Sequence, residues 1–259
     1  MLVEEIMSKN PLYVMEDDFV TKARQLIRDN QLHGLPVLNR DGHVIGIVTI
    51  QEMLKITSTR SNVTVAGFVS EVPVANEDDD VAEAARLLIA AKFDILPVVK
   101  SAEVRDLKGV VSPADIFNNV DLDKVPEWNI GGVMSTEVST CSSQDLVTKV
   151  WDKMLESGFT GLPAVDKKGK PLGMITRSDI LKRGGARIGK EERVRSKDVM
   201  RVERLMSTPL YSIGPEDSLQ DVVKFMQKRD VGRISVVDEG KLVGIVDRYD
   251  LIRAIFRVE

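Results

Sequence analysis

One short sequence pattern occurs four times in the 259 residues and constrains the fold more than any other feature. Each copy opens with glycine and an apolar pair, has a hydroxyl or acidic residue three places after the glycine, and an acid three places later. The opening glycines stand at 46, 109, 173 and 244, so the copies are spaced by 63, 64 and 71 residues. Because these intervals exceed the usual length of a solenoid repeat, we expect four similar globular repeats.

The predicted elements follow the same order in every repeat. In the third repeat Val147, Val150, Trp151 and Met154 fall at offsets 0, 3, 4 and 7, which places them on one face of a helix. A short extended segment precedes this helix, and a β-hairpin and a second helix follow it. The fold class is therefore α+β, with four β-α-β-β-α repeats. We expect side-chain caps at the starts of the first helices, from Asp17, Asp80, Ser143 and Ser218.

Repeat boundaries follow from the same spacing. We assign the repeats to residues 1–60, 61–122, 127–186 and 197–259. A repeat of about 60 residues buries little surface by itself. The repeats are therefore expected to pack in pairs.

Composition narrows the class of protein. The chain is 43% hydrophobic and 29% charged, has no apolar run of about 18 residues, and does not begin like a signal peptide. We therefore expect a cytoplasmic protein without a membrane segment. A single Cys141 with His33 and His43 forms neither a disulfide nor a four-ligand zinc site, so Cys141 is expected to be a packed small side chain.

Charge is unevenly distributed along the chain. Residues 1–128 carry 13 Lys+Arg and 21 Asp+Glu (13 − 21 = −8), whereas residues 129–259 carry 23 and 19 (23 − 19 = +4). The second half is the better host for an anion, but neither half has the basic excess of a nucleic-acid-binding domain. The basic stretch 184–197 is compatible with nucleic-acid binding, with partner docking, or with a solvated connection between repeats, which we favour.

The fourfold pattern Gly-apolar-x-[Ser/Thr]-x-x-[Asp/Glu] resembles four cystathionine-β-synthase (CBS) domains over nearly the whole chain. The resemblance implies two tandem pairs with pseudo-twofold symmetry, as in the gamma subunit of AMP-activated protein kinase, where two pairs form a flat disc. It also implies adenosine ligands in clefts between paired repeats. The motif acid would hold the ribose, the motif hydroxyl would contact phosphate, and a His or Arg before a strand of the paired repeat would neutralise phosphate.

The residue types suit this chemistry. A Ser or Thr where a strand turns into a helix lies beside unpaired backbone N–H groups, which favour a phosphate. An Asp one turn further accepts two hydrogen bonds from a ribose diol, and an Arg from a facing repeat adds charge with bidentate geometry. The same spacing also forms a simple capping box. A single copy does not separate the two interpretations, so the accompanying cation decides between them.

The third copy gives the leading nucleotide site. Thr176 and Asp179 would face Arg233 of the fourth repeat. Arg177 lies beside the motif, either as an additional cation or as an ordinary arginine on a helix surface.

The second copy is a further candidate. Ser112 and Asp115 would face His33, whose ordinary pKa near 6.5 would favour phosphate in slightly acid conditions. Pro113 has no N–H, which removes one donor that a phosphate could have used.

Two copies depart from the pattern. Asp247 of the fourth copy would repel phosphate unless Arg248 or another cation offsets its charge. Asp250 would still hold a ribose, as in adenosine or S-adenosylmethionine. The first copy, with Thr49, would face Asp94 and Ile95 and is expected to bind no phosphate.

The sequence thus predicts a regulatory sensor of AMP, ADP or ATP that acts on an unidentified effector protein or through a homodimer. The alternatives are a ligand-free interaction or scaffold protein, in which the motifs only cap helices, and an S-adenosylmethionine-binding module. No nucleophile, base and orienting group stand together in the sequence, so we expect neither an enzyme, nor a catalytic cofactor, nor a metal.

Overall fold

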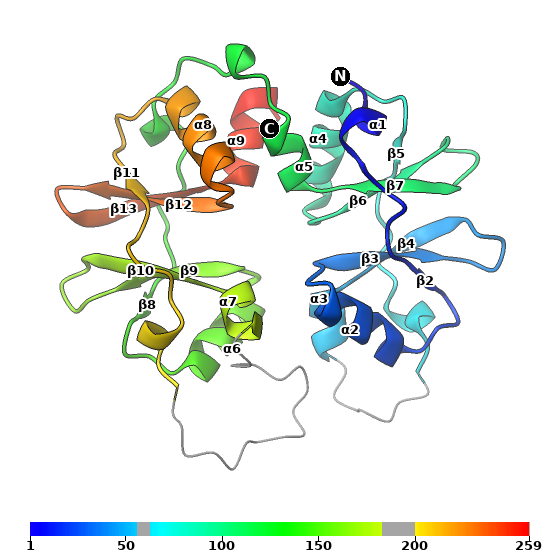
Figure 1. The fold of residues 1–259 in the computed structure, drawn as a ribbon, viewed down its shortest axis with the longest axis horizontal. Coiled ribbons are helices and arrows are strands. Elements are labelled where there is room, and N and C mark those ends of the chain that lie inside the picture. Colours follow the sequence, from blue (N-terminus) through cyan, green and yellow to red (C-terminus); the bar gives the residue numbers. More distant parts are fainter. Residues whose placement is uncertain (56–62, 183–199, 259) are drawn as a thin grey trace. The chain divides into compact units, whose positions relative to one another are not determined.

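The computed structural model describes residues 1–55, 63–182 and 200–258 (Figure 1). The basic stretch 184–197 lies outside the described residues. The chain divides into two compact units. The first unit is Met1–Val125 together with the residues from Leu251, and the second unit is Pro126–Asp250.

Repeat one shows how the predicted order of elements is realised. It contains β2 (Val14–Met15), α2 (Val20–Asp29), β3 (Gly34–Leu38), β4 (Val44–Thr49) and α3 (Ile50–Lys55). The sheet order is β2-β3-β4, with β2 parallel to β3 and β3 antiparallel to β4. The expected β-α-β-β-α arrangement is confirmed here.

The other repeats have the same elements in the same order. Repeat two contains β5 (Ala75–Asn76), α4 (Val81–Ala91), β6 (Leu96–Val99), β7 (Leu107–Val111) and α5 (Pro113–Asn118). Repeat three contains β8 (Cys141–Ser142), α6 (Val147–Ser157), β9 (Gly161–Val165), β10 (Pro171–Thr176) and α7 (Arg177–Lys182). Repeat four contains β11 (Ser212–Ile213), α8 (Leu219–Arg229), β12 (Arg233–Asp238), β13 (Lys241–Asp247) and α9 (Arg248–Phe256).

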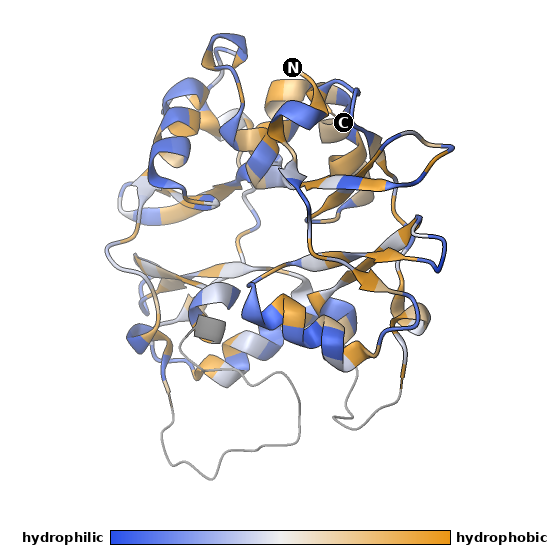
Figure 2. Cartoon of the chain, turned by 45° about the vertical axis from the view of Figure 1, so that its right-hand side comes forward, coloured by the Kyte–Doolittle hydropathy of each residue, from blue (hydrophilic) through white to orange (hydrophobic). Residues whose placement is uncertain are grey.

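The helices are amphipathic, and their apolar faces form the cores. Hydrophilic and hydrophobic residues alternate along them (Figure 2). The predicted apolar face of α6 is buried, as Val147, Val150, Trp151 and Met154 are at most 8% exposed. The periodicity of the sequence therefore identified the core face of this helix correctly.

Each repeat begins with a short leading segment that packs on its paired repeat. The leading segments are residues 1–9, 63–70, 129–135 and 200–207, and they contain α1 (Val3–Ile6), β1 (Ser8–Lys9), η1 (Val65–Phe68), η3 (Ile130–Gly132) and η4 (Val202–Arg204).

The exchange in the second unit is reciprocal. The Ile130 N–H donates to the Asp217 carbonyl at 3.0 Å, and the Val202 N–H donates to the Asp145 carbonyl, also at 3.0 Å. Each leading segment thus satisfies its backbone on a turn of the other repeat.

The first unit repeats this exchange. The Val3 N–H donates to the Asp79 carbonyl at 2.9 Å, and the Val65 N–H donates to the Asp18 carbonyl at 2.8 Å. Because each repeat in a pair receives backbone hydrogen bonds from the other repeat, only the pair has a complete set of these hydrogen bonds.

The glycine that opens each motif is explained by this exchange. A Cβ built on Gly173 would lie 2.6 Å from the Ser207 carbonyl oxygen, and one on Gly244 would lie 2.4 Å from the Met134 sulfur. Beside Gly173, Met174 and Ser207 donate to each other's carbonyls at 3.1 and 2.8 Å. The sequence pattern identified these glycines only as the start of the motif, whereas the structure shows that a leading segment crosses them too closely for a side chain.

The predicted caps are partly correct. Side-chain caps are present on α4 and α8, at Asp80 and Ser218. Asp17 and Ser143 are not caps, because α2 and α6 follow Phe19 and Leu146, whose side chains make no capping hydrogen bond. The first N–H of α6 instead donates to the Met200 carbonyl of the paired repeat at 3.0 Å. A backbone carbonyl of the paired repeat therefore accepts the hydrogen bond that a capping side chain was expected to accept.

Candidate functional site

The third motif lies where β10 turns into α7. The Thr176 N–H and hydroxyl both donate to Asp179 Oδ2, at 2.8 and 2.6 Å, and the Asp179 N–H donates to Thr176 Oγ1 at 3.1 Å. This is a capping box, one of the two interpretations that the spacing allowed. Among the described residues the donors to Asp179 all use Oδ2, so its Oδ1 accepts none of these bonds.

Arg233 is the first residue of β12 in the paired repeat, and its side chain contacts the start of β9, the strand that pairs with β10. Its Nη1 donates to the Gly161 carbonyl at 3.1 Å, and its Nη2 donates to Thr160 Oγ1. Gly161 is the cross-strand partner of Thr176 in the β9–β10 ladder. The structure therefore brings the predicted cation to the strand end that carries the predicted hydroxyl, as the facing arrangement requires.

Arg177 occupies a different place from a surface arginine. It is 7% exposed, and its Nη2 donates to the Met154 carbonyl at 2.5 Å. Met154 belongs to the last turn of α6, where carbonyls have no partner within the helix. Arg177 therefore joins α7 to the end of α6, and its contact with a nucleotide stays a prediction.

The second motif also forms a capping box. The Ser112 N–H and hydroxyl donate to Asp115 Oδ2 at 2.8 and 2.7 Å, and Pro113 is the first helical residue. His33 Nδ1 lies 3.5 Å from an Asp94 carboxylate oxygen, and the His33 side chain is 60% exposed. The structure thus places an acidic side chain beside the predicted phosphate-binding histidine.

The first motif lies near Ile95, one of the two residues that it was expected to face, and the absence of bound phosphate there stays a prediction. Thr49 pairs in register with Gly34, and a Cβ on Gly34 would lie 3.4 Å from Ile95 Cδ1. The Thr49 hydroxyl donates to Glu52. Ile95 stands in repeat two where Arg233 stands in repeat four, so this position supplies no cation to the first motif.

The fourth motif uses its acid as a cap. Asp247 Oδ1 accepts from the N–H groups of Tyr249 and Asp250, at 2.9 and 3.1 Å. Asp250 Oδ2 accepts the Asp247 N–H at 3.0 Å. Asp247 therefore caps the start of α9 in place of the Ser or Thr of the other motifs. A ribose contact of Asp250 stays a prediction.

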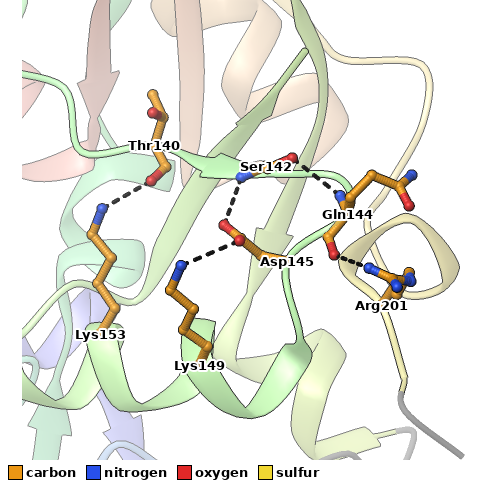
Figure 3. A network of polar contacts seen from close by, with 7 residues as sticks. All are labelled: Thr140, Ser142, Gln144, Asp145, Lys149, Lys153 and Arg201. Carbon is orange, nitrogen blue, oxygen red and sulfur yellow. Dashed lines mark hydrogen bonds and ion pairs between the residues drawn. The ribbon is translucent and has the colours of Figure 1, made fainter. Parts of the chain in front are cut away.

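A hollow of about 290 Å³ lies away from the motifs, between β8 and α6. Asp145 accepts from the Ser142 N–H at 2.9 Å and lies 3.4 Å from Lys149 Nζ, and Lys153 donates to the Thr140 carbonyl at 2.9 Å (Figure 3). The Ser142 N–H holds the pKa of Asp145 below its ordinary value.

The same acid–lysine pair recurs in repeat one, where Lys22 Nζ lies 2.7 Å from Asp18. The hollow is therefore lined by a turn that repeats one and three share. A larger hollow of about 430 Å³ lies beside Glu127, Trp128, Asn129 and Gly132. No motif residue lines either hollow, so the motifs remain the better candidate site.

Cys141 lines that hollow as a core residue. It is 5% exposed, and burial raises the pKa of its thiol to about 11. The thiol is protonated near neutral pH, which confirms the expectation of a packed small side chain.

Within the described ranges no group of three or more His, Cys, Asp or Glu side chains is arranged to hold a metal. Over the same ranges no helix has the length and apolar character to cross a bilayer.

Sequence reasoning missed Thr160 and Gly161. They carry no motif, but they stand at the strand start of repeat three that corresponds to Gly232 and Arg233 of repeat four. Aligning the four strand starts would have identified the position, although not its contact with Arg233.

Comparisons with known proteins agree with the repeat and the fold. The CBS domain family model matches residues 3–58, 65–121, 130–185 and 202–257. Protein MJ1404 of Methanocaldococcus jannaschii is 26% identical over 266 residues, which cover 98% of this chain and 61% of that protein.

Two solved structures share the fold over 98% of this chain. One is MJ1225 of Methanocaldococcus jannaschii, described as a proposed archaeal homologue of g-AMPK, with a TM-score of 0.78, 24% identity and 99% of its own chain covered. The other is a conserved protein of Pyrococcus horikoshii, with a TM-score of 0.71, 21% identity and its whole chain covered. At these identities the likeness concerns the fold alone. Four family matches along nearly the whole chain nevertheless show that it belongs to the CBS-domain family.

Proposed function

We propose that this protein is a regulatory sensor that binds AMP, ADP or ATP between paired CBS repeats. The main support is the position of Arg233. Its guanidinium contacts Gly161, and Gly161 lies directly opposite Thr176 in the β9–β10 ladder. A phosphate at the start of α7 would meet this charge, and an arginine is suited to bidentate phosphate contact. CBS pairs typically bind adenosine ligands in regulatory roles, which supports the ligand class.

The capping box is compatible with this proposal. Asp179 uses Oδ2 for the two donors of Thr176, so Oδ1 is the oxygen that a ribose hydroxyl would use. A carboxylate has acceptor capacity for both roles. Helix capping and ribose binding therefore need not compete for the same atom.

Calorimetric titration of ligand-free protein with AMP, ADP, ATP and S-adenosylmethionine tests the proposal. We expect binding of at least one phosphorylated nucleotide, and Asp179→Ala should remove it while lowering the free energy of unfolding by about 1 kcal/mol, the usual contribution of a helix cap. Asp152→Ala, on the exposed face of α6, is the control and should leave binding unchanged. If none of the four ligands binds to the wild type, the sensor function is wrong.

A ligand-free scaffold is the second candidate, because motif side chains at both capping boxes bond to each other. It predicts that Asp179→Ala changes only stability. The fourth motif favours a further variation, since Asp247 stands where the other copies have a hydroxyl and would repel a phosphate, which suits a ligand such as S-adenosylmethionine. In either case the effector would be a partner protein or a second copy of this chain, and the titration with S-adenosylmethionine separates the two ligand classes.

A further inference from the structure

Thr160 and Gly161 both accept hydrogen bonds from the Arg233 side chain. The carbonyl of Gly161 accepts from Nη1, and the hydroxyl of Thr160 accepts from Nη2, so the two guanidinium nitrogens are held by adjacent residues. A Cβ on Gly161 would lie 3.0 Å from Nη1 and 3.3 Å from Cζ. The guanidinium thus lies against Gly161 at a distance that leaves little room for a side chain there.

The first unit uses the same position differently. Gly34 corresponds to Gly161, and Ile95 corresponds to Arg233. Ile95 Cδ1 lies against Gly34, 3.4 Å from where its Cβ would stand. Each unit therefore places one long side chain over a glycine of the paired repeat, and the chemistry of that side chain differs between the units.

We infer that Thr160 and Gly161 are positioning residues that hold Arg233 in place and make the third-motif site selective for adenosine ligands that carry a phosphate. The inference rests on the proposed function. An arginine side chain is flexible, and restraint before binding reduces the entropy lost when the phosphate arrives. Neither residue needs to touch the ligand, because both act through the guanidinium.

Thr160→Val tests whether the Thr160 hydroxyl positions Arg233. Valine keeps the shape of threonine but removes the hydroxyl that accepts from Arg233 Nη2. We expect AMP to bind about tenfold more weakly, because a hydrogen bond to a charged group is lost. Adenosine, which has no phosphate, should bind within about twofold of the wild type. Thr160→Ser retains the hydroxyl and should restore AMP affinity.

Gly161→Ala is the second variant, because its Cβ would push the guanidinium away from the strand. It should reproduce the loss of AMP affinity with little effect on adenosine. Thr148→Val, the same substitution on the exposed face of α6, is the matched control and should bind AMP like the wild type. Thermal unfolding of each variant checks that the fold is retained.

The outcomes separate the two levels of the proposal. Wild-type protein that binds AMP, with Thr160→Val and Gly161→Ala binding it equally well, would overturn the positioning role and leave the proposed function intact. Equal loss of AMP and adenosine, or a loss that Thr160→Ser does not restore, would show a structural role only and also overturn it. Wild-type protein that binds no adenosine ligand would instead overturn the proposed function.

Discussion

Ser235 is a buried hydroxyl in the middle of β12. It is 0% exposed, and its Oγ has no hydrogen-bond partner among the described residues. The corresponding residues of the other repeats are prolines, at Pro36, Pro97 and Pro163. Repeat four therefore buries a polar side-chain atom at a position where the other three repeats have a proline ring.

Ser235→Ala should increase the free energy of unfolding by about 1 kcal/mol, because an unsatisfied buried hydroxyl is removed. Urea unfolding of the intact protein measures the change through the transition midpoint. Ser178→Ala, on the exposed face of α7, is the control and should change stability by less than about 0.5 kcal/mol. A less stable Ser235→Ala protein would contradict the interpretation.

The sequence predicted those residue contacts that depend on local spacing. Thr176 and Asp179 are three residues apart at a helix start, so their mutual hydrogen bonds follow from helix geometry. Arg177 and Met154 are 23 residues apart, and nothing in the local pattern indicates that they meet. Family resemblance pointed to Arg233, but the contact partners Thr160 and Gly161 required the structure.

At the scale of elements, the leading segments are held by close backbone contact over the motif glycines. Gly173→Ala should destabilise the protein by about 1–3 kcal/mol, because its Cβ would meet the Ser207 carbonyl oxygen at 2.6 Å and backbone does not yield easily. Gly132→Ala is the matched control in the same unit, since its Cβ has no neighbour within 4 Å. Thermal unfolding compares the two variants, and equal midpoints would argue against the crossing.

Helices and hairpins were predictable because their apolar residues recur with a clear period. The leading segments were not, since β1 has two residues and η3 and η4 have three each, too short to show a period. Their partners are also distant in sequence, as Ser8 pairs with Val110. Local pattern therefore predicted the repeat but not the exchange between repeats.

At the scale of the whole molecule, charge should determine the order in which sites fill. The halves carry −8 and +4, and the third motif has Arg233, whereas the second has an exposed His33 beside Asp94. We expect AMP to slow hydrogen exchange around 174–181 at lower concentrations than around 110–117, because a positive field concentrates an anion. Mass spectrometry of exchanged peptides across an AMP series measures this order, and the reverse order would contradict it.

The exchange of leading segments also determines when the chain can fold during synthesis. Residues 1–9 leave the ribosome before the rest of their pair, but β1 has its partner only after β7 has been made, about 100 residues later. Residues 129–135 likewise wait for Ile245, which bonds to Ser135 in both directions. Almost the whole of each pair must therefore be synthesised before its leading segment can form these backbone hydrogen bonds. A single nascent repeat emerges with its leading segment unpaired.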